Sequence, residues 1–136
     1  MAPVVGITSS PSGNGYLLAA SDGGVFAFGD AGFRGSEGGR PLAAPVTGIA
    51  SAAHGGYWLT ASDGGVIAFG APFLGSMGGH PLAGPVVGIS ATPDGGGYWL
   101  VGSDGGVFNF GDATFSGARS GSTGGSPVVG ITRTYG

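Results

Sequence analysis

The carboxylates come first, because a carboxylate can hold a metal ion or act as a general acid or base. Three of them occupy the same Ser-Asp-Gly-Gly motif, as Asp22, Asp63 and Asp104. A single carboxylate per loop is too few for Ca²⁺, which takes about six to eight oxygen ligands. An aspartate in this setting commonly accepts a hydrogen bond from its own backbone and stabilises a turn. We therefore predict that these three aspartates are structural turn residues and bind no metal.

The other acids and histidines show no arrangement typical of an active site. They are Asp30, Glu37, Asp94, Asp112, His54 and His80. The aspartates stand in or before predicted turns, and the histidines lack a metal-ligand spacing such as H-x-x-x-H. A glycosidase needs two carboxylates that flank one bond, and no pair here indicates such a site. We expect no catalytic residue, no cofactor and no metal, and keep a glycan-active enzyme only as the least favoured alternative.

Two Tyr-Trp pairs are the best candidates for contacts with a ligand. They are Tyr57 with Trp58 and Tyr98 with Trp99. Aromatic rings can stack on the faces of sugars, and the indole N–H suits a partly exposed cleft. Packing in a core between repeats is the alternative, and we favour it. If a glycan does bind, these four residues are the ones that we expect to contact it.

Composition excludes several classes of partner. Lysine is absent, the four arginines are scattered and the net charge is -3, so neither nucleic acid nor an anionic membrane is expected. Cysteine is absent, which excludes disulfides and thiolate metal sites. No apolar run approaches the roughly 20 residues of a membrane span. No signal-peptide pattern precedes the first repeat, and we interpret Met1-Ala2 as an expression start on a fragment of something longer.

A repeat organises these residues. Ser-Asp-Gly-Gly begins at residues 21, 62 and 103, a spacing of 41 both times, and Pro-Val-x-Gly-Ile begins at residues 3, 45, 85 and 127. Self-similarity of this kind predicts stacked structural units. We divide the single domain into unit one at 3–44, unit two at 45–84, unit three at 85–126 and an extra first strand at 127–136.

Each unit is predicted to hold four short strands and no helix, because Gly or Pro interrupts every window of helical length. First strands are expected at 3–7, 45–49 and 85–89, second strands at 15–20, 56–61 and 97–102, and third strands at 25–28, 66–69 and 107–110. Asp-Gly between the second and third strands is a hairpin signal. A short fourth strand is expected around Phe33, Phe73 and Phe115.

The second and third strands indicate how the units pack. Segments 98–101 and 25–28 are apolar throughout instead of alternating apolar with polar residues. Continuous apolar strands are typical of a sheet that is covered on both faces. We therefore predict an all-β, repeat-built β-propeller with three four-stranded blades per chain. The alternatives are a β-trefoil and a β-prism, whose strands should alternate because one face of each sheet is largely wet.

The motif GYWLxxSDGGVFxFGDAxFxGS, joined by PVVGI, resembles a tandem repeat of secreted actinobacterial proteins. The resemblance covers nearly the whole chain. It implies propeller-like blades, often beside cell-wall or hydrolytic domains, and a secreted or cell-surface parent protein. It implies no catalytic residue. The departures are Leu17 in place of tryptophan in unit one and Ala71-Pro72 in place of Asp-Ala in unit two, so a ligand site that needs either residue in every unit cannot be threefold.

Three blades are too few for a closed propeller, which needs roughly four to eight. We therefore predict a head-to-tail homodimer in which two chains close a six-bladed ring. The surplus first strand either frays or pairs across the seam. For function we expect a non-catalytic binding or scaffold module, with a cell-wall or other glycan as the ligand. A purely structural, self-assembling fragment without a ligand, natural or engineered, is the alternative.

Overall fold

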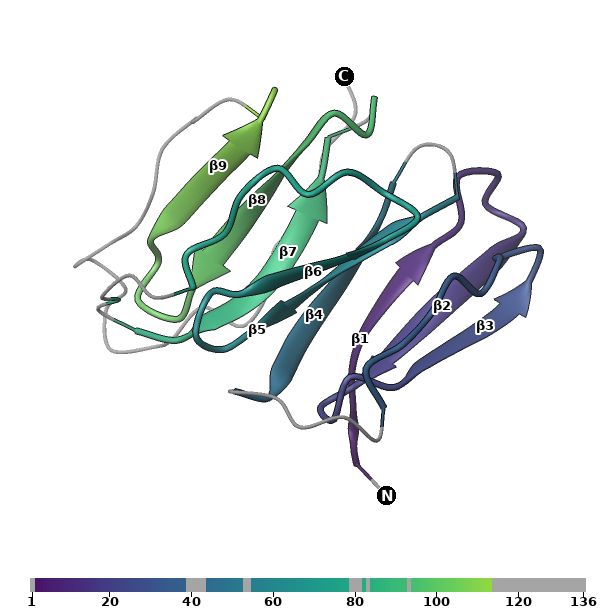
Figure 1. Ribbon diagram of the computed structural model, residues 1–136, viewed down its shortest axis with the longest axis horizontal. Coiled ribbons are helices and arrows are strands. Elements are labelled where there is room, and N and C mark those ends of the chain that lie inside the picture. The colour runs from purple at the N-terminus through teal and green to yellow at the C-terminus, as the bar shows by residue number, and fades with distance from the viewer. Residues whose placement is uncertain are drawn as a thin grey trace.

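The computed structural model of the chain describes residues 2–38, 44–52, 55–78, 82, 84–92 and 94–113. These residues form nine β-strands and no helix (Figure 1), so the prediction of an all-β protein is confirmed. The high glycine content is compatible with strands because the glycines gather in turns and at close approaches between backbones.

The strands form three separate antiparallel sheets, one in each predicted unit. In each sheet three consecutive strands are neighbours in chain order, with the middle strand paired to both others. The first sheet contains β1 (Val4–Ser9), β2 (Gly15–Ala20) and β3 (Val25–Gly29). The second contains β4 (Val46–Ser51), β5 (Tyr57–Ala61) and β6 (Val66–Phe69). The third contains β7 (Val86–Ala91), β8 (Gly97–Gly102) and β9 (Val107–Gly111).

The predicted fourth strand of each sheet is wrong for units one and two. No strand forms around Phe33 or Phe73, and Phe115 lies outside the described residues. The physical reason lies in the next unit. The backbone N–H of Arg34 and the carbonyl of Gly35 bond to the Tyr57 hydroxyl, so these groups are not paired with a neighbouring strand. Among the described residues, each sheet is therefore three-stranded instead of four-stranded.

All three sheets repeat the same local details. Each first strand carries a register shift just before its glycine, between Val4 and Gly6 in the first sheet and at the matching positions in the others. Such a bulge increases strand twist. The turn between second and third strands places Gly23 at a φ of 88°, a conformation that glycine adopts readily. The equivalence of the units therefore extends from the sequence to the backbone.

The two faces of each sheet have different roles. Strand pairing puts the second-strand tyrosine on the same face as aromatic or aliphatic residues of the neighbouring strands. We call this the tyrosine face: Ile7, Tyr16, Phe26 and Phe28 in the first sheet, Ile49, Tyr57, Ile67 and Phe69 in the second, and Ile89, Tyr98, Phe108 and Phe110 in the third. The other side, which carries Leu17, Trp58 or Trp99, is called the opposite face.

The tyrosine face of one sheet packs on the opposite face of the preceding sheet. One core joins Leu17 and Ala19 of the first sheet to Tyr57 and Leu59 of the second. An equivalent core joins Trp58 of the second sheet to residues of the third. The first strands β1, β4 and β7 lie beside one another along the row of sheets (Figure 1). The three sheets therefore pack face to face in chain order.

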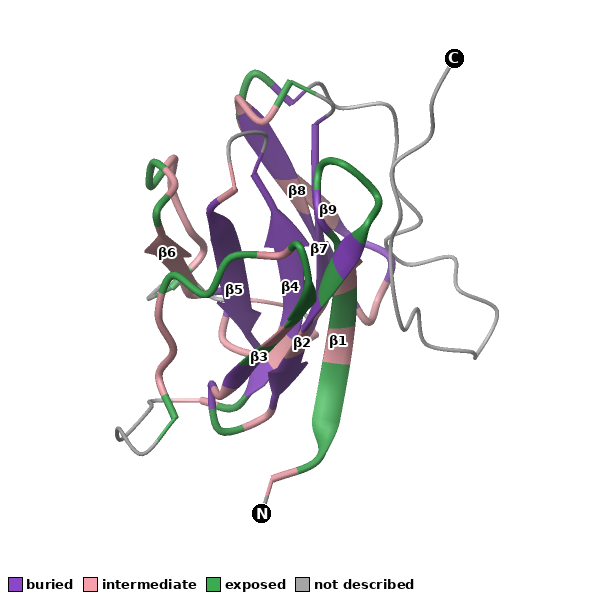
Figure 2. Ribbon diagram, turned by 90° about the vertical axis from the view of Figure 1, so that its right-hand side faces the viewer, coloured by how far each residue is buried: buried purple, intermediate pink, exposed green. Residues whose placement is uncertain are grey.

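Burial follows from this order. β5 is buried along its whole length in the middle of the row, whereas β1 is largely exposed (Figure 2). The expectation that continuous apolar strands are covered on both faces therefore holds for the second sheet. It fails for the first, where Tyr16 of β2 is exposed and neither core of the described residues includes its face.

Candidate functional site

The junction between consecutive units is built around a buried tyrosine. Tyr57 begins β5, and its hydroxyl accepts a hydrogen bond from the N–H of Arg34 at 2.8 Å and donates one to the carbonyl of Gly35 at 2.5 Å. Tyr98 repeats the contact with Leu74 and Gly75 at 3.2 and 2.5 Å. Burial raises the pKa of both phenols above its ordinary value. Each tyrosine thus ties its own unit to the loop that leaves the previous one.

A phenylalanine on the third strand completes this contact. Phe69 lies 5.6 Å from Tyr57, ring centre to ring centre, and Phe110 lies at the same distance from Tyr98. A β-carbon added to Gly35 would come within 2.7 Å of the Phe69 ring. The ring therefore packs directly on the glycine backbone of the preceding unit, which a larger residue would prevent.

Trp58 occupies the other side of the second sheet. It is fully buried, its indole N–H donates to the carbonyl of Pro72 at 2.7 Å, and its ring lies 5.0 Å from that of Tyr98. Three of the four predicted ligand residues, Tyr57, Trp58 and Tyr98, are therefore buried in contacts between sheets. Trp99, at the position that corresponds to Trp58, is half-buried on the opposite face of the third sheet.

The first strands approach one another through glycines. A β-carbon on Gly6 would lie 3.3 Å from the Cα of Gly48, and one on Gly48 would lie 3.3 Å from the Cα of Gly88. Near these glycines, the Ser51 hydroxyl donates a hydrogen bond to the carbonyl of Ser9 at 2.7 Å. The glycine of the Pro-Val-x-Gly-Ile motif therefore sets the spacing between units.

The hairpin aspartates lie in turns at one end of the sheets. Asp22 accepts the N–H of Gly24 at 3.0 Å, Asp63 that of Gly65 at 2.9 Å, and Asp104 that of Gly106 at 3.0 Å. A carboxylate that accepts the N–H two residues further on is an Asx turn. This geometry stabilises the hairpin and uses one of the oxygens that a metal would require.

Hydroxyl and carboxylate groups meet in units one and three, a cluster that sequence reasoning missed. Ser10 donates to Asp30 at 2.6 Å and Ser12 also donates to it, which lowers the pKa of Asp30. In unit two alanines stand at the equivalent positions, Ala52 and Ala71. The sequence does carry a signal for this hydroxyl–carboxylate pairing. Units one and three have a Ser or Thr after the first strand and an aspartate after the third strand, and unit two has neither.

In unit three the cluster holds two carboxyl groups. The Thr92 hydroxyl lies 2.7 Å from an Asp94 oxygen and 3.1 Å from an Asp112 oxygen, and it can donate its single proton to either carboxyl. A hydrogen bond between the two carboxyls lowers the pKa of Asp94 to about 2 and raises that of Asp112. The two carboxyl groups therefore titrate as a coupled pair. The pair closes the loop between β7 and β8 onto the end of β9.

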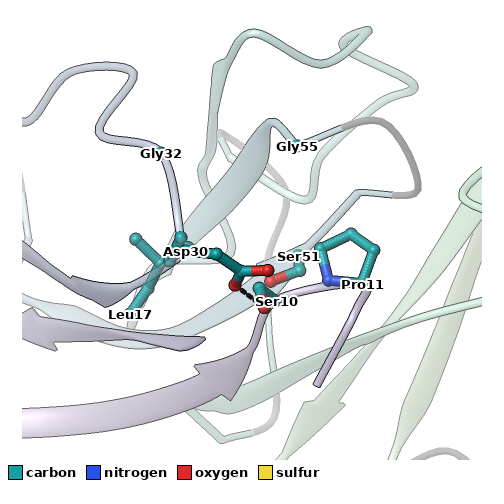
Figure 3. A pocket seen from close by; sticks show the side chains of 8 residues that line it. Ser10, Pro11, Leu17, Asp30, Gly32, Ser51 and Gly55 are labelled. Carbon is teal, nitrogen blue, oxygen red and sulfur yellow. Dashed lines mark hydrogen bonds between the residues drawn. The ribbon is translucent and has the colours of Figure 1, made fainter. Parts of the chain in front are cut away.

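A small cavity lies beside the Asp30 cluster (Figure 3). Its volume is about 40 Å³, and Leu17, Asp30 and Ser51 are among the residues that line it. That volume holds a few water molecules and is too small for a sugar ring. Glycan binding would therefore require a different surface.

The described residues contain no group of three or more His, Asp or Glu side chains that could hold a metal ion. His54 and His80 lie outside the described part of the chain. In the same part, no helix is long and apolar enough to cross a membrane. No protein-family model and no curated protein matched the sequence when it was compared with them, so the resemblance to the actinobacterial repeat stays a prediction.

Proposed function

We propose that this chain is a non-catalytic scaffold module that works by docking like units onto one another. The observation that carries the proposal is the use of its aromatic residues. Tyr57, Trp58 and Tyr98 are fully buried. The hydroxyls of Tyr57 and Tyr98 donate to the loop of the preceding unit, and the Trp58 ring lies 5.0 Å from the Tyr98 ring of the next unit. Side chains committed in this way hold sheets together and offer no stacking platform to a ligand.

The proposal includes a propeller-like ring. In the proposed ring each three-stranded sheet is one blade, in place of the four-stranded blade expected from the sequence, and β1, β4 and β7, which contact one another in turn, line the inner side. A second copy, added head to tail, would bring the ring to six blades, within the range of roughly four to eight that closed propellers use.

The bare end of the row supports self-assembly. Ile7 is 65% exposed, whereas its counterparts Ile49 and Ile89 are 4% and 6% exposed. Tyr16 is 43% exposed, whereas Tyr57 and Tyr98 are not exposed at all. An apolar sheet face of this kind on a folded protein marks an interface. The first unit therefore carries the same face as its neighbours without the cover that they have.

Mass in solution tests the ring. Native mass spectrometry at micromolar concentration is expected to give twice the 12.9 kDa of one chain. A stable monomer would contradict the ring, and a ladder of larger species would show docking without closure.

Glycan binding at the Tyr-Trp pairs is the competing proposal, in the secreted or cell-surface setting that the resemblance implies. Titration with soluble cell-wall glycans while tryptophan emission is followed separates the two. On the scaffold proposal the emission stays unchanged across the panel. A saturable shift that disappears in a folded Trp99→Ala variant would favour the binding module instead.

A further inference from the structure

The dipeptide Asn14-Gly15 is the one place in the sequence where glycine follows asparagine. Asparagine is chemically labile in proteins, and a glycine after it leaves the backbone nitrogen open to approach because it has no β-carbon. We propose that Asn14-Gly15 is a site of spontaneous deamidation and that the Ser10 side chain slows the reaction by holding the Gly15 N–H. The proposal concerns the first unit alone and does not depend on the assembly proposed above.

The reaction needs water and no other reagent. The Gly15 nitrogen loses its proton to solvent and forms a bond with Cγ of Asn14, while Nδ2 takes up a proton and leaves as ammonia. The product is a cyclic succinimide. Water then adds to one of its two carbonyls and opens the ring, which leaves either aspartate or isoaspartate at position 14. One water is consumed and one ammonia released, with no oxidation or reduction.

Ser10 holds Gly15 at both of its backbone groups. The Gly15 N–H donates to the Ser10 Oγ at 3.1 Å in a buried contact, and the Ser10 N–H donates to the Gly15 carbonyl at 2.9 Å. The Ser10 hydroxyl donates to Asp30 at 2.6 Å (Figure 3), so its oxygen can accept from Gly15. Attack requires the Gly15 nitrogen to lose this proton and to turn toward the side chain of Asn14, and both hydrogen bonds oppose that movement.

The neighbouring strand leaves little room for this movement. Gly15 is buried at the start of β2, where it pairs with Gly29 of β3. A β-carbon on Gly29 would meet the carbonyl oxygen of Asn14 and would lie 2.7 Å from the Cα of Gly15. An isoaspartate inserts an extra main-chain atom at this point of close approach. Its formation is therefore expected to open the end of the β2–β3 pair.

The other units supply the variants for a test. Thr92 stands at the Ser10 position of unit three, and its hydroxyl accepts the Gly97 N–H at 3.0 Å. Ala52 stands there in unit two, where its N–H still donates to the Gly56 carbonyl at 2.7 Å. Both side chains are compatible with this type of loop. Ser10→Thr therefore keeps the hydroxyl, whereas Ser10→Ala removes it and keeps the backbone bond.

Incubation of the full chain at neutral pH, followed by peptide mass spectrometry, measures the conversion of amide to acid at Asn14. The folded wild type should react more slowly than the same chain unfolded in urea. Ser10→Ala should raise the folded rate by about two- to tenfold, the range that corresponds to one hydrogen bond, and Ser10→Thr should keep the wild-type rate. In urea all three chains should react equally fast, because the residues next to Asn14 are unchanged.

Asn109 is the internal control for general unfolding. It precedes Phe110 instead of a glycine, and its Nδ2 donates to the carbonyl of Ala113 at 3.0 Å. Its amide should therefore stay intact in all three folded chains. A rise at Asn109 that matches the rise at Asn14 would assign the acceleration to loss of the whole fold and overturn the role of Ser10.

Three other results would also overturn the proposal. They are a folded wild type that reacts as fast as the unfolded chain, a Ser10→Ala variant that reacts no faster than wild type, and a Ser10→Thr variant as fast as Ser10→Ala. Hydrogen exchange of the Gly15 N–H, followed by NMR in the wild type, needs no substitution. This N–H should be protected by its bond to Ser10, and exchange at the rate of an unfolded chain would contradict the proposal even if Ser10→Ala did not fold.

Discussion

The phenol of Tyr57 joins two units through one side chain. Its hydroxyl satisfies a backbone donor and a backbone acceptor of the loop after β3, and its ring packs on Phe69. Buried backbone groups without a hydrogen-bond partner destabilise the folded state. The main contribution of the hydroxyl is therefore to pair the Arg34 N–H and the Gly35 carbonyl. The same logic applies to Tyr98, whereas Tyr16 is exposed.

Replacing Tyr57 by Phe should lower the free energy of unfolding by about 1–3 kcal/mol, because it leaves the Arg34 N–H and the Gly35 carbonyl without that partner. Urea unfolding at a dilution that keeps the chain monomeric measures it. Tyr16→Phe is the control and should change stability by less than about 0.5 kcal/mol, as exposed substitutions usually do. Equal effects at the two positions would contradict the role of the hydroxyl.

Asp30 should make folding stability depend on acid pH. Hydrogen bonds from Ser10 and then Ser12 lower its pKa below 3.8 in the folded state. A carboxyl whose pKa is lower when folded stabilises the protein above pH 3.8, and this contribution is lost as the pH falls through the folded pKa. The stability difference between wild type and Asp30→Asn should therefore shrink below pH 3.8.

Unfolding curves at a series of pH values, together with carboxyl NMR titration, check this prediction. Ser10→Ala removes the largest cause of the shift and should raise the Asp30 pKa towards its ordinary value. A difference between wild type and Asp30→Asn that stays constant with pH would contradict the link.

The hairpins are stabilised by local contacts, whereas the loop after the third strand is stabilised by contacts with residues distant in sequence. Each hairpin is held by neighbours in sequence, through an Asx turn and a glycine with positive φ. The loop after β3 is held instead by the next unit, since Gly35 contacts Phe69 and Tyr57. A change in this loop should therefore disturb a junction and not only a turn.

Gly35→Ala should cost about 2 kcal/mol or more, because φ is +133° there and the new methyl would lie 2.7 Å from the Phe69 ring. Gly32→Ala in the same loop is the matched control, since its β-carbon would meet nothing closer than 3.6 Å. Thermal and chemical unfolding of both variants decides the matter. A neutral Gly35→Ala would show that this close packing contributes nothing.

Across the whole molecule, the sheet that is most buried by its neighbours is expected to unfold last. The second sheet is packed on both sides, whereas the tyrosine face of the first is bare. Amide exchange is slow where opening must break many buried contacts. Stability is therefore expected to be graded along the row of sheets, with its maximum in the middle.

Hydrogen exchange should be slowest in β5 and faster in β2 at low protein concentration. If two copies dock through the tyrosine face of the first sheet, protection of β2 should rise with concentration while that of β5 stays unchanged. Mass spectrometry of exchanged peptides at two concentrations measures both. Uniform protection of the two strands at every concentration would contradict the gradient and the assembly.

Short-range features of this fold could be predicted from the sequence. The second strands expected at 15–20 and 97–102 are β2 and β8 with the same limits, and the third strands agree to within one residue. These elements depend on apolar runs and on the Asp-Gly hairpin between them, which are signals from adjacent residues. The expected division into repeated units rests on the 41-residue spacing of the Ser-Asp-Gly-Gly motif.

Only the tertiary structure decided what the loops and aromatic side chains do. The segment around Phe33 has the composition of an edge strand, yet its backbone is bonded to Tyr57, which follows Arg34 by 23 residues. From the sequence, Trp58 could either stack on a sugar or pack in a core. In the structure it is buried against Tyr98 of the third sheet. A residue's type sets which contacts are possible. The packing of another unit on it decides which contact is made, because burial and hydrogen bonding at these junctions come from residues distant in the chain.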